Sequence, residues 1–180
     1  MDRRFFAKSM AGSAAMVWLQ GLGSSGRGAF FSSIPCERNH ILSPSQAATL
    51  EAMAAQIIPT DDTPGAREAR VVNFIDNGLA TFAANQRPVM ERGLAAFDAE
   101  VRSRFPDAGG FAALQGATQI ELMISLEQRD PVFFESVRVA TLAGMFADPK
   151  YGGNFEKTGW KLIGFEDRFG WGPPFGDYDR

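Results

Sequence analysis

The sequence has very little of the chemistry from which covalent and metal sites are built. Among its 180 residues there is one cysteine, Cys36, and one histidine, His40. A single cysteine excludes an intramolecular disulfide, and it leaves no Cys-x-x-Cys-His motif for covalent haem attachment. A single histidine excludes a site made of several histidines. These two shortages remove several classes of enzyme at once.

Clustered positive charge and a nucleotide-binding fingerprint are also missing. The chain carries 18 Lys and Arg against 21 Asp and Glu, a formal net charge of −3, and has no basic run. We therefore expect no binding to nucleic acid. No Gly-x-Gly-x-x-Gly follows a predicted strand, so no dinucleotide site is recognisable. We expect this chain by itself to have no catalytic residues and to bind no cofactor and no metal.

The first 26 residues have the order of a targeting segment. Two arginines and a lysine precede a mildly apolar run, residues 10–22, that is too short and too rich in Gly, Ala and Ser to span a bilayer comfortably. This resembles a twin-arginine export signal, which would deliver the folded protein to the periplasm through the twin-arginine translocase. An amphipathic first helix is the alternative. The residues that match the signal are Arg3, Arg4, Phe6 and Lys8.

The remainder is predicted to be a linker, residues 27–41, and a single helical domain, residues 42–180. The linker contains Gly, Ser, Arg and Pro and has no helical period, and Cys36 within it is interpreted as a free thiol. In the domain, apolar residues recur at helical spacing and no long alternating pattern indicates a strand. The fold class expected is an all-α bundle of about five helices with an aromatic, glycine-rich C-terminal loop and tail.

Local start and stop signals place the helices. Ser43 with Gln46 has capping-box spacing, as does Thr118 with Glu121, and a proline follows Asp130 at a favoured first helical position. The apolar faces include Leu50, Phe74, Phe97, Leu122, Ile124 and Phe134. The helices are expected to run from Ser43 to Pro59, from about Arg67 to Ala84, from Arg87 to Phe105, from Thr118, and from Asp130 to about Ala147.

The stretch Asp148–Phe165, DPKYGGNFEKTGWKLIGF, begins the C-terminal extension and is the most unusual part of the sequence. Pro149 ends the preceding helix, and Gly152-Gly153 allows positive φ values. Its aromatic residues either cover the protein's own helices or face a partner. For Trp160 we favour the partner. The candidate interface is made of Tyr151, Gly152, Gly153, Asn154, Phe155, Trp160, Lys161 and Phe165.

Two motifs carry a resemblance to a known family. The first is Ile57-Ile58-Pro59-Thr60-Asp61 with Pro64-Gly65-Ala66, and the second is Asp148–Asn154 with Gly159–Phe165. Together with the twin-arginine leader, they make residues 42–165 resemble the gluconate 2-dehydrogenase subunit 3 family. That family provides the small subunit of membrane-associated flavin dehydrogenases that oxidise sugars and sugar acids.

The resemblance implies a complex of three parts. A flavin subunit holding FAD oxidises the substrate, a c-type cytochrome subunit holding haem c accepts the electrons, and the small subunit accompanies the flavin subunit and carries its export signal. A periplasmic location, in association with the cytoplasmic membrane through the complex, is expected. Two alternatives stay open: an enzyme using Asp61, Asp62, Asp148 and His40, and a free-standing periplasmic sugar-binding or scaffold protein.

Overall fold

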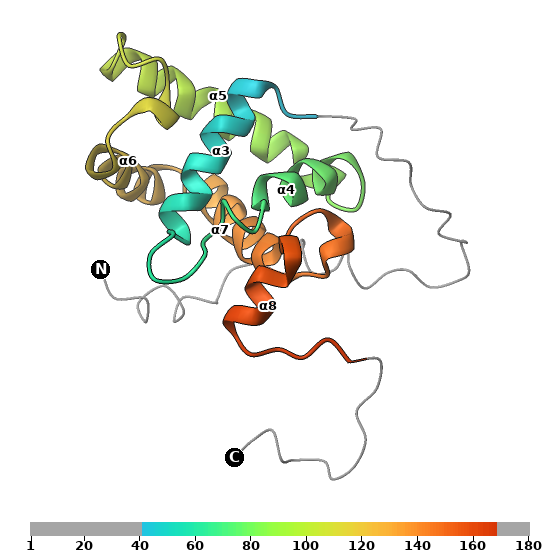
Figure 1. Ribbon diagram of the computed structural model, residues 1–180. Helices are drawn as coiled ribbons and strands as arrows, with labels where there is room; N and C mark the ends of the chain where they lie inside the picture. The colour runs from blue at the N-terminus through green and yellow to red at the C-terminus, as the bar shows by residue number, and fades with distance from the viewer. Residues whose placement is uncertain (1–40, 169–180) are drawn as a thin grey trace.

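The computed structural model describes residues 41–168, and this part of the chain is α-helical, without strands (Figure 1). The predicted all-α bundle is confirmed. Six α-helices make up the described domain, and 3-10 turns lie in three of the connections between them. They are α3 (Pro44–Ile57), α4 (Val71–Ala80), α5 (Arg87–Arg104), α6 (Gly116–Arg129), α7 (Pro131–Phe146) and α8 (Thr158–Leu162). The export-signal residues Arg3, Arg4, Phe6 and Lys8, together with Cys36, His40, nearly all of the linker and the tail beyond residue 168, lie outside the described residues.

Helix α7 is the one against which the others pack. It contacts α3, α4, α5, α6 and α8, and it runs through the middle of the domain (Figure 1). Its side chains are buried at almost every turn, including Phe133, Val137 and Ala140. At Gly93 on α5, an added Cβ would lie 2.2 Å from the Phe133 ring, so this glycine lets α5 approach α7 closely. Removal of these apolar side chains from water is the main stabilising contribution to the bundle.

Three of the predicted helix starts are confirmed. Ser43 accepts a hydrogen bond from the Gln46 backbone N–H, while the Gln46 side chain accepts from the Ser43 backbone, which completes the capping box of α3. Asp130 accepts from the backbone N–H of Phe133 at 3.1 Å and caps α7. The third predicted helix, from Arg87, is also confirmed as α5.

Three predicted boundaries are wrong. Helix α4 begins at Val71 rather than near Arg67, because Arg70 adopts a left-handed conformation with φ of 52° and interrupts the helix there. The same helix ends at Ala80 rather than at Ala84, which begins a separate 3-10 turn. Helix α6 begins at Gly116 with Gln115 as its N-cap, so Thr118 lies inside the helix and does not cap it. On the same helix Ile124, predicted to be part of the apolar face, is 41% exposed, whereas Leu122 is buried.

The C-terminal extension contains more regular structure than a loop. After α7 the chain forms two 3-10 turns, Pro149–Tyr151 and Phe155–Lys157, and then the short helix α8. Helix α8 and the residues that follow it extend away from the bundle (Figure 1). Within residues 41–168, none of the helices has the length and apolar character needed to cross a bilayer.

Candidate interaction site at the C-terminal segment

The end of α7 is closed by Asn154. A helix leaves its last carbonyl groups without partners in the helix. Here the Asn154 backbone N–H donates to the Gly144 carbonyl at 2.7 Å, and its side-chain amide donates to the Ala147 carbonyl at 2.9 Å. The Asn154 side-chain oxygen in turn accepts from the Gly159 N–H at 2.8 Å. Asn154 is 0% exposed. The first two bonds tie the C-terminal extension to the end of α7, and the third holds the start of α8 against Asn154.

Two glycines allow this close contact. A Cβ added to Gly153 would lie 2.2 Å from the Gly144 carbonyl oxygen, and one added to Gly159 would lie 1.9 Å from the Met145 carbonyl oxygen. Both obstacles are backbone atoms, so neither can move aside cheaply. Gly152 takes the positive φ, 99°, that the sequence analysis expected of the Gly152-Gly153 pair.

Trp160 joins the end of α7 to the end of α8. Its indole Nε1–H donates to the Phe146 carbonyl at 2.7 Å, which satisfies another terminal carbonyl of α7. Helix α8 then ends in a Schellman motif. The Phe165 N–H donates to the Trp160 carbonyl at 2.8 Å, the Gly164 N–H donates to the Lys161 carbonyl at 3.2 Å, and Gly164 has φ of 68°. The Trp160 and Phe165 rings meet edge to face with centroids 5.0 Å apart, the apolar contact that accompanies this motif.

The segment is also fastened to the beginning of α4. The Phe155 N–H donates to the Ala69 carbonyl at 3.1 Å, and the Arg70 guanidinium carbon lies 3.4 Å from the centroid of the Phe155 ring. The left-handed Arg70 that shortens α4 lies at this contact. The Asn77 side chain donates to the Tyr151 carbonyl at 3.3 Å. These contacts fix the position of α8 relative to the bundle.

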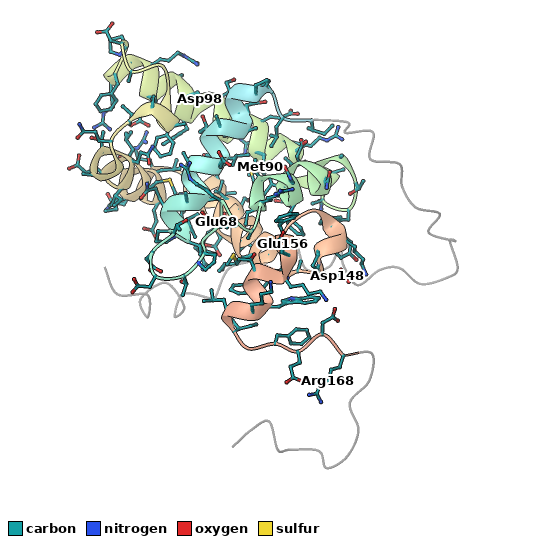
Figure 2. All side chains as sticks on the ribbon, in the orientation of Figure 1. Glu68, Met90, Asp98, Asp148, Glu156 and Arg168 are labelled. Carbon is teal, nitrogen blue, oxygen red and sulfur yellow. The ribbon has the colours of Figure 1, made fainter. Side chains whose placement is uncertain are left out.

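The predicted interface residues fall into three groups by exposure. Gly153 and Asn154 are buried in the domain, and Tyr151, Gly152 and Trp160 are partly buried, with Tyr151 packed edge to face against Phe82. The side chains of Phe155, Lys161 and Phe165 are exposed and accessible to a partner. The sequence analysis favoured a partner contact for Trp160, whereas the structure gives its indole a hydrogen bond within the domain. Figure 2 shows the side chains of the segment, with Asp148 and Glu156 close to α8 and Arg168 well away from the bundle.

Sequence reasoning missed two exposed apolar residues, Leu162 and Ile163. Ile163 is 60% exposed, and with Phe165 at 46% it gives the end of α8 a concentration of apolar surface. The sequence signal that could have identified them is the pair Leu162-Ile163 directly before a glycine. A helix of a few residues that ends at this glycine cannot bury both side chains. We call residues 162–168, at the end of α8, the apolar arm. Its exposed apolar side chains are Leu162, Ile163 and Phe165.

Three ion pairs lie within residues 148–168. The Lys157 ammonium lies 2.8 Å from the Asp167 carboxylate, the Lys150 ammonium lies 3.1 Å from the Asp148 carboxylate, and Arg168 pairs with Glu166. Burial on its own raises the pKa of Asp148. Hydrogen bonds from the backbone and side chain of Lys150, and the Lys150 charge, outweigh that effect and hold the pKa below its ordinary value. The hydrogen bond to Asp148, together with its charge, raises the pKa of Lys150.

The first sequence motif forms the tight loop between α3 and α4. Asp61 accepts from both the backbone N–H and the hydroxyl of Thr63, at 3.0 and 2.9 Å. Glu68 accepts from the Thr60 hydroxyl at 2.7 Å and from the Gly65 N–H at 2.8 Å. The Thr60 hydroxyl contributes most to lowering the pKa of Glu68, followed by the Gly65 N–H. The carboxylates of Asp61 and Glu68 therefore have structural partners in this loop.

Of the proposed enzymatic set, Asp61, Asp62 and Asp148 lie in residues 41–168, whereas His40 is outside the described range. Within that range, no three His, Cys, Asp or Glu side chains gather in a way that could hold a metal ion.

A surface hollow of about 250 Å³ lies elsewhere, between α3, α5 and the turn at Phe111–Ala113. Its polar residues include Thr49 and Asp98, and the Thr49 hydroxyl donates to the Asp98 carboxylate at 3.1 Å.

Comparison with models of known protein families identifies a match. The family model for gluconate 2-dehydrogenase subunit 3 matches residues 44–167. The match covers all six described helices and includes both the loop between α3 and α4 and the C-terminal segment. No curated protein and no solved structure matches the chain.

Proposed function

The chain belongs to the gluconate 2-dehydrogenase subunit 3 family, and on this premise we propose that it is the non-catalytic small subunit of a periplasmic, FAD-dependent dehydrogenase complex. In this proposal the chain binds and stabilises the flavin-containing catalytic subunit and carries the export signal for both. FAD belongs to that catalytic subunit and haem c to a cytochrome subunit. The substrate is a sugar or sugar acid, oxidised at a CH–OH group by the catalytic subunit.

The observation that carries the proposal is the combination of a fixed C-terminal segment with an exposed apolar arm. Asn154 and Trp160 donate side-chain hydrogen bonds to the end of α7. Residues 148–161, which these bonds hold against the bundle, are called the platform. That platform presents Ile163 and Phe165 to solvent. Rigid presentation of exposed apolar side chains favours binding to another protein, because little conformational freedom remains to be lost.

Export is tested by changing Arg3 and Arg4 together to lysine. This keeps both positive charges and removes the guanidinium pair that resembles the twin-arginine signal. We expect both this chain and the flavin subunit to remain in the cytoplasm, as measured by cell fractionation. The matched control is Arg92→Lys with Arg102→Lys, two exposed arginines on α5, which should leave export unchanged. Normal delivery of the flavin subunit by the N-terminal variant would contradict the carrier function.

Binding is tested by co-expression of the affinity-tagged full chain with the flavin subunit. We expect the two to purify together and the purified complex, but not this chain alone, to show flavin absorbance and to oxidise sugars with an artificial electron acceptor. A chain that purifies alone and binds a sugar by calorimetry would support the free-standing sugar-binding alternative instead. Flavin or haem absorbance in the isolated chain would contradict the assignment of the chemistry to other subunits.

A further inference from the structure

The apolar arm concentrates exposed apolar surface on very few residues. Large apolar side chains that are exposed in residues 41–168 occur in a few places, and three of them, Leu162, Ile163 and Phe165, lie within four residues at the end of α8. The arm also extends from the bundle rather than lying on it (Figure 1). A segment that projects in this way exposes its side chains in several directions. A groove, which surrounds a segment, covers such an arm better than a flat surface does.

The base of the arm is held in place. The Trp160 indole is bonded to the end of α7, and the Schellman motif at Gly164 sets the direction in which the chain leaves α8. The ion pair between Lys157 and Asp167 adds a further tie between α8 and the arm. Binding of a segment that already has its direction fixed costs less conformational entropy than binding of a free tail.

From these observations we propose that the apolar arm is a docking peptide that inserts into an apolar groove on the flavin-containing subunit. This inference rests on the proposed function and names the segment through which the two subunits bind. The arm is non-helical after Leu162, so its recognition uses individual side chains, with Ile163 and Phe165 as the anchors. Burial of two such side chains is sufficient for a hot spot, because a few anchors contribute most of the affinity at protein interfaces.

A membrane surface fits the arm less well than a protein groove. Membrane-binding segments combine apolar residues with an excess of Lys and Arg that attracts anionic lipid. Residues 156–168 contain three basic and three acidic side chains, a net charge of zero, and two of the basic side chains, Lys157 and Arg168, are in ion pairs.

The experiment uses the full chain and the flavin subunit, with Ile163→Asp and Phe165→Asp combined. We expect the affinity, measured by biolayer interferometry, to fall at least thirtyfold, as for the loss of interface anchors. The matched control is Ile124→Asp with Val132→Asp, because these side chains are 41% and 56% exposed on α6 and α7, away from the arm. The control should change affinity by no more than about threefold. The single change Ile163→Asp is included because it leaves the Trp160–Phe165 ring contact in place.

The possible outcomes separate this inference from the proposed function. Failure of the wild-type chain to bind the flavin subunit would contradict the proposed function itself. Wild-type binding with undiminished binding by the arm variants would overturn only the docking arm. Two further results would also overturn it: arm-dependent sedimentation with phosphatidylcholine–phosphatidylserine vesicles, or arm-dependent dimers of the isolated chain in analytical ultracentrifugation. Thermal melts of each variant check that the domain remains folded.

Discussion

Replacement of Asn154 by alanine tests whether the C-terminal segment is fastened as the structure shows. The change removes two side-chain hydrogen bonds, one donated to the Ala147 carbonyl and one accepted from the Gly159 N–H. Gly159 is buried, so water cannot replace the hydrogen bond that its N–H loses, and that loss costs about 2 kcal/mol. The Ala147 carbonyl is partly exposed, and loss of its hydrogen bond costs about 1 kcal/mol. Asn154 also has φ of 44°, a left-handed conformation that costs alanine about 1 kcal/mol. Alanine should therefore lower the free energy of unfolding by about 4 kcal/mol, a large share of a typical domain's total.

The comparison with glycine makes this prediction sharper. Glycine at position 154 loses the same two hydrogen bonds but adopts the left-handed conformation without cost. At an ordinary helical position glycine is less stable than alanine by about 0.5–1 kcal/mol. At position 154 the order should reverse, with glycine more stable than alanine by about 1 kcal/mol. That reversal depends on the backbone conformation and not on the hydrogen bonds.

Urea denaturation followed by far-ultraviolet circular dichroism measures both free energies for the isolated chain. The midpoint should fall in the order wild type, Asn154→Gly, Asn154→Ala, with an unchanged slope. An alanine variant within about 1 kcal/mol of the wild type would show that Asn154 does not fasten the segment. A glycine variant less stable than the alanine variant would show that the backbone at this position is not left-handed.

Three further predictions concern the same platform and the loop between α3 and α4. Gly159→Ala places a Cβ 1.9 Å from the Met145 carbonyl oxygen and should destabilise the isolated chain by about 3 kcal/mol in the same denaturation assay. Trp160→Phe loses the indole hydrogen bond to the Phe146 carbonyl and should cost about 1 kcal/mol, whereas Trp160→Ala should cost more, as melting will show. Hydrogen bonds hold the pKa of Glu68 below its ordinary value of 4.5, so its stabilisation is present above that pH and lost as the pH falls through the folded-state pKa. Glu68→Gln should accordingly lose less stability than the wild type between pH of about 5 and about 3 in denaturation measurements.

The element types could be predicted because the signals for them are local. Ser43 with Gln46 and Asp130 with Pro131 start helices through atoms a few residues apart, and the structure confirms both. Thr118 shows the limit of this reasoning. Its capping-box spacing with Glu121 was present, but the chain had already entered helix at Gly116. A residue with capping-box spacing caps a helix only if its own backbone is extended rather than helical.

The site could be found by its composition but its internal bonds could not be predicted. The aromatic and glycine content of residues 148–165 marked the segment as unusual. Which of its residues are buried depends on Asn154 meeting α7 and on Phe155 meeting Ala69, contacts between parts of the chain far apart in sequence. Helix α4 shows a related limit. It begins at Val71 rather than near Arg67, and Arg70, whose left-handed backbone interrupts the helix, lies against Phe155, a residue far later in the sequence.

Trp160 belongs both to the platform and to the base of the arm, and this sharing decides how partner-binding experiments must be interpreted. Its indole hydrogen bond stabilises the end of α7, while its ring and its carbonyl position Phe165. If the arm is the docking segment, truncation of Trp160 should reduce partner affinity even when its ring touches no partner atom, because the arm loses its fixed direction and binding then costs more entropy. Ile163 has no such connection, since its side chain is 60% exposed. A variant at Ile163 that binds weakly and melts normally reports on the interface itself, whereas one at Trp160 reports on the platform and the interface together.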